Sequence, residues 1–153
     1  MTVALNRLRL EQTSQQLQKF QALRGARAPQ GGWLRTIRQV LGRTSRQQAA
    51  RVGVGSASLL RSEQAEAEER ISLGQLRKLA AALDCELVYA IVPRRPLQET
   101  VESRAEEKAR EEILGVAHSM SLEEQRPSDE FLTQQLSRRR DELLSGKWSH
   151  LWR

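Results

Sequence analysis

The chain has 153 residues, with 25 Lys and Arg against 19 Asp and Glu, and its formal net charge is +6. This length suits one domain with extensions and excludes two large domains, while the basic balance favours a polyanionic partner. Aromatic residues make up 4% of the chain, too few for a platform on which RNA bases stack, whereas a helix that reads a DNA groove needs none.

The positive charge is concentrated in the first part of the chain. Residues 1–64 contain 11 basic and 2 acidic residues, and residues 65–153 contain 14 basic and 17 acidic residues. This asymmetry predicts a nucleic-acid-facing part and a second part with another task. One cysteine, no signal-like segment after Met1 and no apolar run of membrane-spanning length lead us to expect a cytoplasmic protein.

The first 31 residues are expected to form a helix and a basic arm. Leucines and a phenylalanine recur at helical spacing over about residues 3–23, with no Gly or Pro before Gly25. Residues 24–32 then concentrate helix breakers and two arginines. This arm could lie along a phosphate backbone, or it could be a plain solvated linker.

Residues 32–83 have the pattern of a compact all-α domain. We expect a helix from Trp33 that ends at Gly42 and a second that starts at Thr44 or Ser45 and ends at Gly53. A third should run over about residues 56–65, and a fourth, capped by Ser72, should extend to about residue 83.

Residues 84–96 are predicted to contain one short C-terminal β-strand and a linker. The strand would comprise residues 86–92, which are rich in β-branched and aromatic types and precede Pro93. No second convincing strand exists, so the strand is expected to pair with its own copy and make a homodimer. Its dimerising residues would be Leu87, Val88, Tyr89, Ala90, Ile91 and Val92. The alternative is a hydrophobic terminal turn that packs on the helical domain.

Residues 97–153 are expected to form a C-terminal helical extension. Apolar residues recur every four positions from Leu97 to Ile113 within a highly charged segment, which indicates an amphipathic helix. A last helix should begin after Ser128 and end at Gly146. Trp148 and Trp152 would anchor the tail by packing, or would mark a protein interface.

The strongest functional signal is a helix-turn-helix pattern over residues 45–63. Such a motif needs a small residue where its helices cross and a residue that tolerates positive φ in the turn. The positions that match are Ala49, Val52, Gly53, Val54 and Leu59. Two positions depart from the motif, because Gln48 and Ser62 stand where an apolar core residue is usual.

In this interpretation the helix that begins near Ser56 enters the DNA major groove. The residues that would face base edges are Ser56, Ala57, Ser58, Leu60 and Arg61, with Arg61 able to make a bidentate guanine contact. The residues that would contact phosphates are Ser45, Arg46 and Gln47 at the start of the preceding helix, together with Arg43, Arg35 and Arg38. Each of these last three could instead be a solvated side chain.

Two segments, 35–42 and 71–80, which flank this pattern, resemble the lambda-repressor-like, XRE-type DNA-binding domains. More specifically, the chain is similar to the mobile mystery protein A family over the segments 32–38, 63–66, 82–93, 118–125 and 151–152. The resemblance implies a small bacterial regulator, often encoded beside a Fic-domain protein in a pair that resembles a toxin–antitoxin system. Gly55 departs from the family, whose members usually have a Ser or Thr cap there.

An antitoxin could also act by blocking its partner's active site. Antitoxins of Fic enzymes are known for a helix in which a Ser or Thr precedes a glutamate by four residues and Gly or Asn follows. Three pairs here have that spacing, Ser62–Glu66, Ser103–Glu107 and Ser119–Glu123, but Ala, Lys and Glu follow them. This device is therefore disfavoured, while direct contact through the acidic C-terminal half remains open.

The sequence favours neither a metal site nor an enzyme. His118, His150 and Cys85 are too widely spaced for a structural zinc site, and neither a phosphate-binding glycine loop nor a nucleophile elbow is present. We therefore expect no cofactor and a sequence-specific double-stranded DNA-binding homodimer that represses its own operon. The alternative is a protein-interaction antitoxin that neutralises a neighbouring gene product, with DNA binding only auxiliary.

Overall fold

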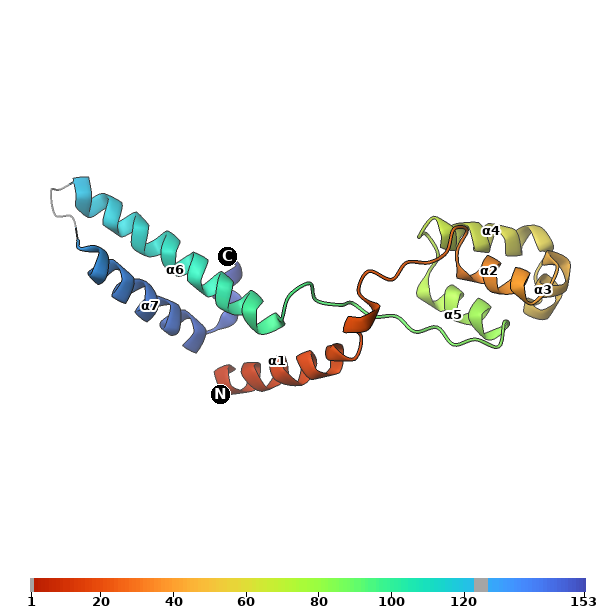
Figure 1. Ribbon diagram of the computed structural model, residues 1–153, viewed down its shortest axis with the longest axis horizontal. Helices are drawn as coiled ribbons and strands as arrows, with labels where there is room; N and C mark the ends of the chain where they lie inside the picture. The colour runs from red at the N-terminus through yellow and green to blue at the C-terminus, as the bar shows by residue number, and fades with distance from the viewer. Residues whose placement is uncertain (1, 123–126) are drawn as a thin grey trace. The chain divides into compact units, whose positions relative to one another are not determined.

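The structure is a computed structural model that describes residues 2–122 and 127–153 (Figure 1). Those residues are mostly helical and contain no β-strand, so the fold is all-α. They divide into two compact units. One comprises residues 23–90, and the other combines the residues up to Ala22 with those from Ile91 onward. None of the described helices has the length and apolar character needed to span a membrane.

The first unit is a bundle of four short helices. Each contributes to one core, because its apolar residues recur on one face. The core residues are Leu34, Ala49, Leu59, Leu79 and Leu83, all at most 5% exposed. The helices are α2 (Trp33–Val40), α3 (Ser45–Val52), α4 (Ser56–Ala67) and α5 (Leu73–Ala81).

All four helices end in the same way, with a residue of positive φ. Gly42 and Gly53 end α2 and α3 with φ of 70° and 81°, as the glycines predict. Glu69 and Asp84 occupy the same conformation after α4 and α5, each with φ of 57°. In every case the next backbone N–H donates to a carbonyl five residues earlier, which satisfies a carbonyl that the helix end would otherwise leave free.

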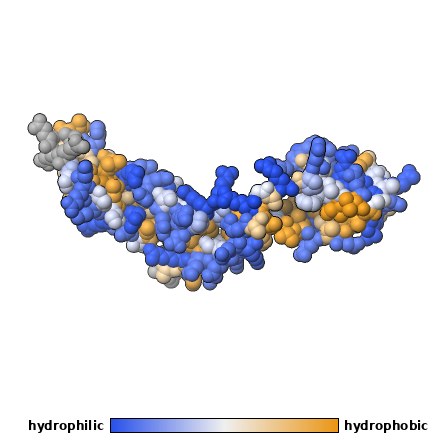
Figure 2. Space-filling view, viewed as in Figure 1, coloured by the Kyte–Doolittle hydropathy of each residue, from blue (hydrophilic) through white to orange (hydrophobic). Residues whose placement is uncertain are grey.

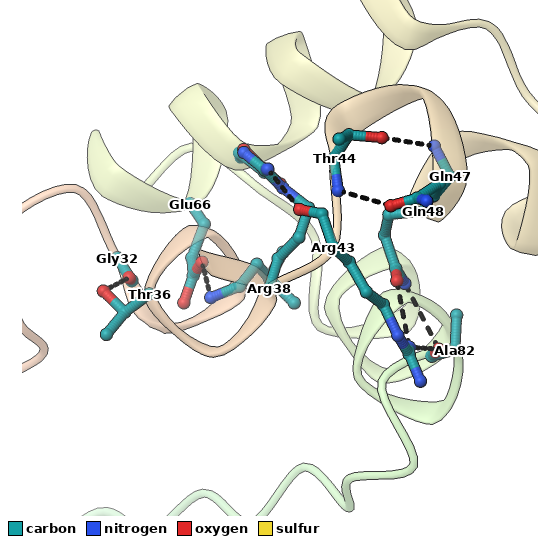
Figure 3. A network of polar contacts seen from close by, with 11 residues as sticks. Gly32, Thr36, Arg38, Arg43, Thr44, Gln47, Gln48, Glu66 and Ala82 are labelled. Atoms are coloured by element: carbon teal, nitrogen blue, oxygen red, sulfur yellow. Dashed lines mark hydrogen bonds and ion pairs between the residues drawn. The ribbon is translucent and has the colours of Figure 1, made fainter. Parts of the chain in front are cut away.

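Two glutamates of α4 fix helix α2 against it. The guanidinium of Arg38 donates to both carboxylate oxygens of Glu63, at 2.5 and 3.0 Å. The carboxylate of Glu66, which is labelled in Figure 3, accepts the backbone N–H groups of Trp33 and Leu34, both at 2.9 Å, and so caps the start of α2. A carboxylate is favourable there because the first N–H groups of a helix lack partners and carry partial positive charge.

The strand predicted over residues 86–92 is not formed. Residues 85–93 run without helix, turn or bend, and no backbone group of residues 86–92 hydrogen-bonds elsewhere in the described chain. These residue types suit a strand, but a ladder needs a second strand, and one copy of the chain supplies none. The packed-turn alternative is not formed either, because Val88, Tyr89 and Ile91 are 63%, 59% and 82% exposed.

The second unit is built around a helical hairpin. Helices α6 (Leu97–Leu122) and α7 (Asp129–Ser145) pack along each other, and α1 (Thr2–Gln18) packs on α6. The sequence predicts a single helix over residues 3–23, but α1 ends at Gln18, and a separate 3-10 turn, η1 (Gln21–Leu23), follows it. The N-terminal helix, expected to belong with the basic arm, instead lies in the unit of the C-terminal helices.

The last residues of the chain pack back on this hairpin as the 3-10 helix η2 (Trp148–Trp152). Leu151 is fully buried with Ala105 and Ala109 of α6. Trp148 packs on the same cluster and its indole N–H donates to the Leu144 carbonyl at 3.0 Å. Trp152 is 57% exposed, so only one of the two tryptophans expected to anchor the tail does so.

Candidate nucleic-acid interface

The turn between α3 and α4 determines how the two helices meet. Gly53 has φ of 81° and ψ of 29°, and the N–H of Val54 donates to the Ala49 carbonyl at 3.0 Å. Ala49 and Leu59 are 2% and 3% exposed. A small side chain at the first of these positions lets α4 approach α3 closely, while half-buried Val52 and Val54 pack on the same core.

Gln48, the first departure from the sequence pattern, is a satisfied core residue. Its side-chain amide donates to the Ala82 carbonyl at 3.2 Å, and its oxygen accepts from Arg43 at 3.1 Å. Gln48 is 2% exposed, and both bonds are partly buried; Figure 3 shows them. Because buried polar groups are tolerated when they are hydrogen-bonded, Gln48 can replace an apolar residue and link α3 to the end of α5.

Ser62, the second departure, is also satisfied within its own helix. Its hydroxyl donates to the Ser58 carbonyl, one turn earlier, at 3.1 Å, and the side chain is half-buried. A serine at this position therefore leaves no buried polar group without a partner. Neither departure prevents α3 and α4 from packing together.

The outward face of α4 carries one continuous row of exposed side chains. Ala57, Leu60, Arg61 and Gln64 are exposed, and their spacing of three and four residues places them on one side of the helix. Ser56 and Ser58 are half-buried at the edge of this row. Four of the five residues predicted from the sequence to face bases lie in the first turn and a half, and Arg61 follows. Gln64 continues the row and was missed, although its spacing of seven from Ala57 could have indicated it.

A shallow depression of about 480 Å³ adjoins this row. Its lining combines Ser58 and Arg61 of α4 with Arg70 from the connection after α4 and with Ser72 and Gln75 at the start of α5. The Ser72 hydroxyl accepts the backbone N–H of Gln75 at 3.1 Å and caps that helix. The sequence identified Ser72 only as a cap, because nothing in it indicates that the start of α5 lies beside Arg61.

The start of α3 is closed by a reciprocal pair of caps. The Thr44 hydroxyl accepts the Gln47 N–H at 3.2 Å, and the Gln47 side-chain oxygen accepts the Thr44 N–H at 2.9 Å (Figure 3). Gln47, a predicted phosphate contact, therefore keeps only its side-chain NH₂ for a ligand. Arg46 beside it is exposed, and Ser45 is half-buried.

Arg38 and Arg43, two predicted phosphate contacts, turn into the protein. Arg38 is 7% exposed and is bound by Glu63, whose hydrogen bond raises the pKa of Arg38 above its ordinary value. Arg43 donates to Gln48 and, at 3.2 Å, to the Ala82 carbonyl. The prediction is wrong for Arg38, because a buried guanidinium paired with a carboxylate cannot reach a phosphate.

Arg35 and Arg51 lie exposed on this unit, as Arg46 and Arg61 do. Arg35, which the sequence predicts either to contact a phosphate or to be solvated, is exposed. Arg51, which is not among the predicted phosphate contacts, has a side chain 50% exposed, and its guanidinium lies 3.8 Å from the Asp84 carboxylate. Such a distant pair between exposed groups is weak, so it leaves Arg51 able to meet an anion.

Within residues 2–122 and 127–153, no group of three or more His, Cys, Asp or Glu side chains could hold a metal ion. The face seen in Figure 2 is mainly hydrophilic, and hydrophobic side chains are exposed on both units. No family model matches this chain, and no match was found among curated proteins or solved structures.

Proposed function

We propose that residues 23–90 form a helix-turn-helix domain of the XRE type, which binds double-stranded DNA sequence-specifically and acts as a transcriptional regulator. The observation that carries this proposal is the exposed row of Ala57, Leu60, Arg61 and Gln64 on a helix that Gly53 and Ala49 set firmly against α3. A base-reading helix has to present side chains from a rigid position, because contacts to base edges depend on their geometry.

The chemistry of the row suits a major groove. An α-helix fits into that groove, and the 12 residues of α4 extend about 18 Å. Arg61 can donate two hydrogen bonds to one guanine, Leu60 and Ala57 can contact a thymine methyl, and Gln64 can pair with adenine. Arg46 and the first N–H groups of α3 would then meet the phosphate backbone.

Charge supports the same surface. Residues 12–62 contain no acidic residue, so every charged side chain from the start of the arm through the first half of α4 is basic. The first two carboxylates after them, Glu63 and Glu66, are bound to Arg38 and to the N–H groups of α2. Neither is therefore free to repel a phosphate backbone near the exposed row.

The biological role follows from the resemblance to mobile mystery protein A. We propose a cytoplasmic homodimer that represses its own operon, which would also encode a Fic-domain protein. Two domains related by a two-fold axis would read half-sites about 34 Å apart, roughly one turn of DNA.

A second function, direct neutralisation of a neighbouring gene product, rests on exposed apolar residues of the α6–α7 hairpin. Leu114, Leu122 and Phe131 are 48%, 75% and 48% exposed and could meet a protein partner. The glutamate device gains no support from the contacts. Glu66 caps α2 and Glu107 lies 3.3 Å from Arg104, while the third pair ends at Glu123, outside the described residues.

The test is a binding titration against DNA from the chain's own upstream region and against a scrambled sequence, at two salt concentrations. Specific binding should favour the first DNA by about 10³-fold or more, and overall affinity should fall as salt rises. Equal affinity for both DNAs would contradict the proposal. In parallel, Arg61→Ala should reduce the preference at particular base pairs, whereas Arg46→Ala should weaken binding to both DNAs alike.

Arg77→Ala is the matched control for loss of one positive charge. Arg77 is exposed on α5 and lies about 200° around that helix from Gln75, which lines the depression beside Arg61. Its removal should leave the preference for the upstream DNA unchanged. A loss of preference equal to that of Arg61→Ala would move the reading surface away from α4.

A further inference from the structure

The segment that joins α5 to α6 has residue types that favour a strand, but no other strand pairs with it in the described chain. Residues 86–92 offer their backbone N–H and C=O groups without a hydrogen bond, and three of their large apolar side chains are mostly exposed. A row of open backbone groups flanked by apolar side chains is a template for pairing with another strand. Water can satisfy the backbone, but it leaves the exposed apolar surface of Val88, Tyr89 and Ile91 uncovered.

We infer that a second copy of the chain covers this segment by pairing with it as an antiparallel strand, with Ala90 on the two-fold axis. Charge selects the antiparallel direction. Glu86 lies just before the apolar run and Arg94 just after it, and both are exposed. Antiparallel pairing sets each glutamate near the partner's arginine, whereas parallel pairing would set like charges side by side.

Charge also selects the register. An antiparallel pair with exact two-fold symmetry has one residue opposite its own copy. Each of the remaining residues then lies opposite the partner residue that is equally far along the chain on the other side of the axis. Only with Ala90 on the axis does Glu86 lie opposite Arg94. The same register sets Val88 opposite Val92 and Tyr89 opposite Ile91, which are favourable β-branched and aromatic pairs. The small side chain of Ala90 leaves room for its copy.

Pro93 decides which backbone groups point toward the partner. Alternate residues of an antiparallel strand direct their N–H groups to the neighbouring strand, and proline has none to offer. Pro93 therefore belongs to the outward set, with Tyr89 and Ile91. The N–H groups of Glu86, Val88, Ala90, Val92 and Arg94 then point inward and form the ladder. This pairing specifies the homodimer of the proposed function, yet it does not require that the chain bind DNA.

A charge exchange in the full-length chain tests the register, with the dimer dissociation constant measured by sedimentation. Glu86→Arg and Arg94→Glu should each weaken the dimer by about tenfold, because each creates two like-charge pairs. The double variant should restore it to within about threefold. Arg95→Glu is the matched control, since residue 95 lies on the other face of the strand, and it should change little. A double variant as weak as either single variant would overturn the register.

Spin labels measure the position of the axis directly. In a Cys85→Ser background, single cysteines at positions 88, 90 and 92 each give one distance between the two copies. Labels at 90 should be closest, and labels at 88 and 92 should share an equal, longer separation, since each pair lies about 14 Å apart along the strands. A shorter distance at 88 or 92 than at 90 would contradict the placement of the axis on Ala90.

Two proline variants separate inward from outward N–H groups. Ala90→Pro should abolish the dimer because it removes the central pair of hydrogen bonds, and Tyr89→Pro should retain the ladder at reduced strength. Equal dimerisation of both variants, or a wild-type chain that stays monomeric, would overturn the inference. Titration of the same samples with upstream DNA keeps the two proposals apart. A monomer that prefers its own upstream DNA would contradict only the pairing, and a dimer without that preference would contradict only the proposed function.

Discussion

Arg38 and Glu63 form a bidentate ion pair inside the four-helix unit, where the two residues are 7% and 4% exposed. A further donor of Arg38 reaches the Arg43 carbonyl at 3.1 Å, so each of the three guanidinium nitrogens donates a hydrogen bond. The pair joins α2 to α4, the helix that presents the candidate DNA-reading row. The position of α4 in the unit therefore depends on a charge pair with almost no access to water.

Removal of one partner should destabilise the unit strongly. Glu63→Ala leaves the Arg38 charge buried without a carboxylate, and we expect a loss of about 3–5 kcal/mol in the free energy of unfolding. Urea denaturation followed by circular dichroism measures this change. Arg38→Met with Glu63→Leu is the control, since an apolar pair of similar volume should recover most of the loss. A single variant as stable as the wild type would contradict the burial of this pair.

Gly32 is the second position at which α2 depends on α4. Its φ is 84°, and a Cβ there would lie 2.7 Å from a carboxylate oxygen of Glu66. The ψ of Gly32 is 167°, which with this φ is a conformation essentially limited to glycine, so Gly32→Ala should cost about 1–3 kcal/mol for the backbone, plus the cost of displacing the cap. Gly25→Ala is the matched control, because Gly25 has φ of 83° with no atom within 4 Å of such a Cβ. Thermal unfolding of the two variants should differ, with Gly32→Ala the less stable, and equal losses would show that the Glu66 contact contributes nothing.

Substitution by glycine at the ends of α4 and α5 should stabilise the protein. Glu69 and Asp84 adopt φ of 57°, a conformation that costs energy for a residue with a Cβ. Glu69→Gly should raise the free energy of unfolding by about 0.5–1 kcal/mol, as measured by chemical denaturation. The reverse change at an equivalent helix end, Gly53→Ala, should lower it. If Glu69→Gly destabilised the chain, the side chain rather than the backbone would dominate at that position.

A side-chain cap should stabilise the start of α4, the helix that we propose reads DNA. Gly55 is the N-cap of α4, has ordinary φ and ψ of −76° and 155°, and gives no side-chain hydrogen bond. Its added Cβ would meet nothing within 4 Å. Gly55→Ser should therefore add about 0.5–1 kcal/mol of stability, from the cap and from a less flexible unfolded chain. Gly55→Ala separates these two contributions in the same denaturation experiment, because it lacks the hydroxyl. A Ser variant no more stable than the Ala variant would mean that no cap forms.

The helices of the four-helix unit could be predicted from the sequence because their signals are local. Gly42 and Gly53 mark the ends of α2 and α3, and their positive φ is present in the structure. The ends of α4 and α5 were harder to place. Glu69 and Asp84 there adopt positive φ, for which glycine is the usual signal, and neither Glu nor Asp indicates it in a sequence.

The contacts between helices could not be predicted in the same way. The sequence presents Arg38 as one more basic residue in a basic segment, since Glu63 lies 25 positions away and only the fold brings the two together. The strand prediction failed for a related reason. The residue types of this segment favour a strand, but a strand needs a partner strand that one chain does not supply. The row of α4 was largely predicted because it depends on spacing along a single helix.

Leu151 has no exposed surface, and Arg104 and Lys108 of α6 donate to the backbone carbonyls of Leu151 and His150. Removal of residues 148–153 would therefore uncover Ala105 and Ala109, more than 40 residues upstream of Leu151, and expose apolar surface on α6. Loss of this segment should therefore destabilise the α6–α7 hairpin rather than merely shorten the chain.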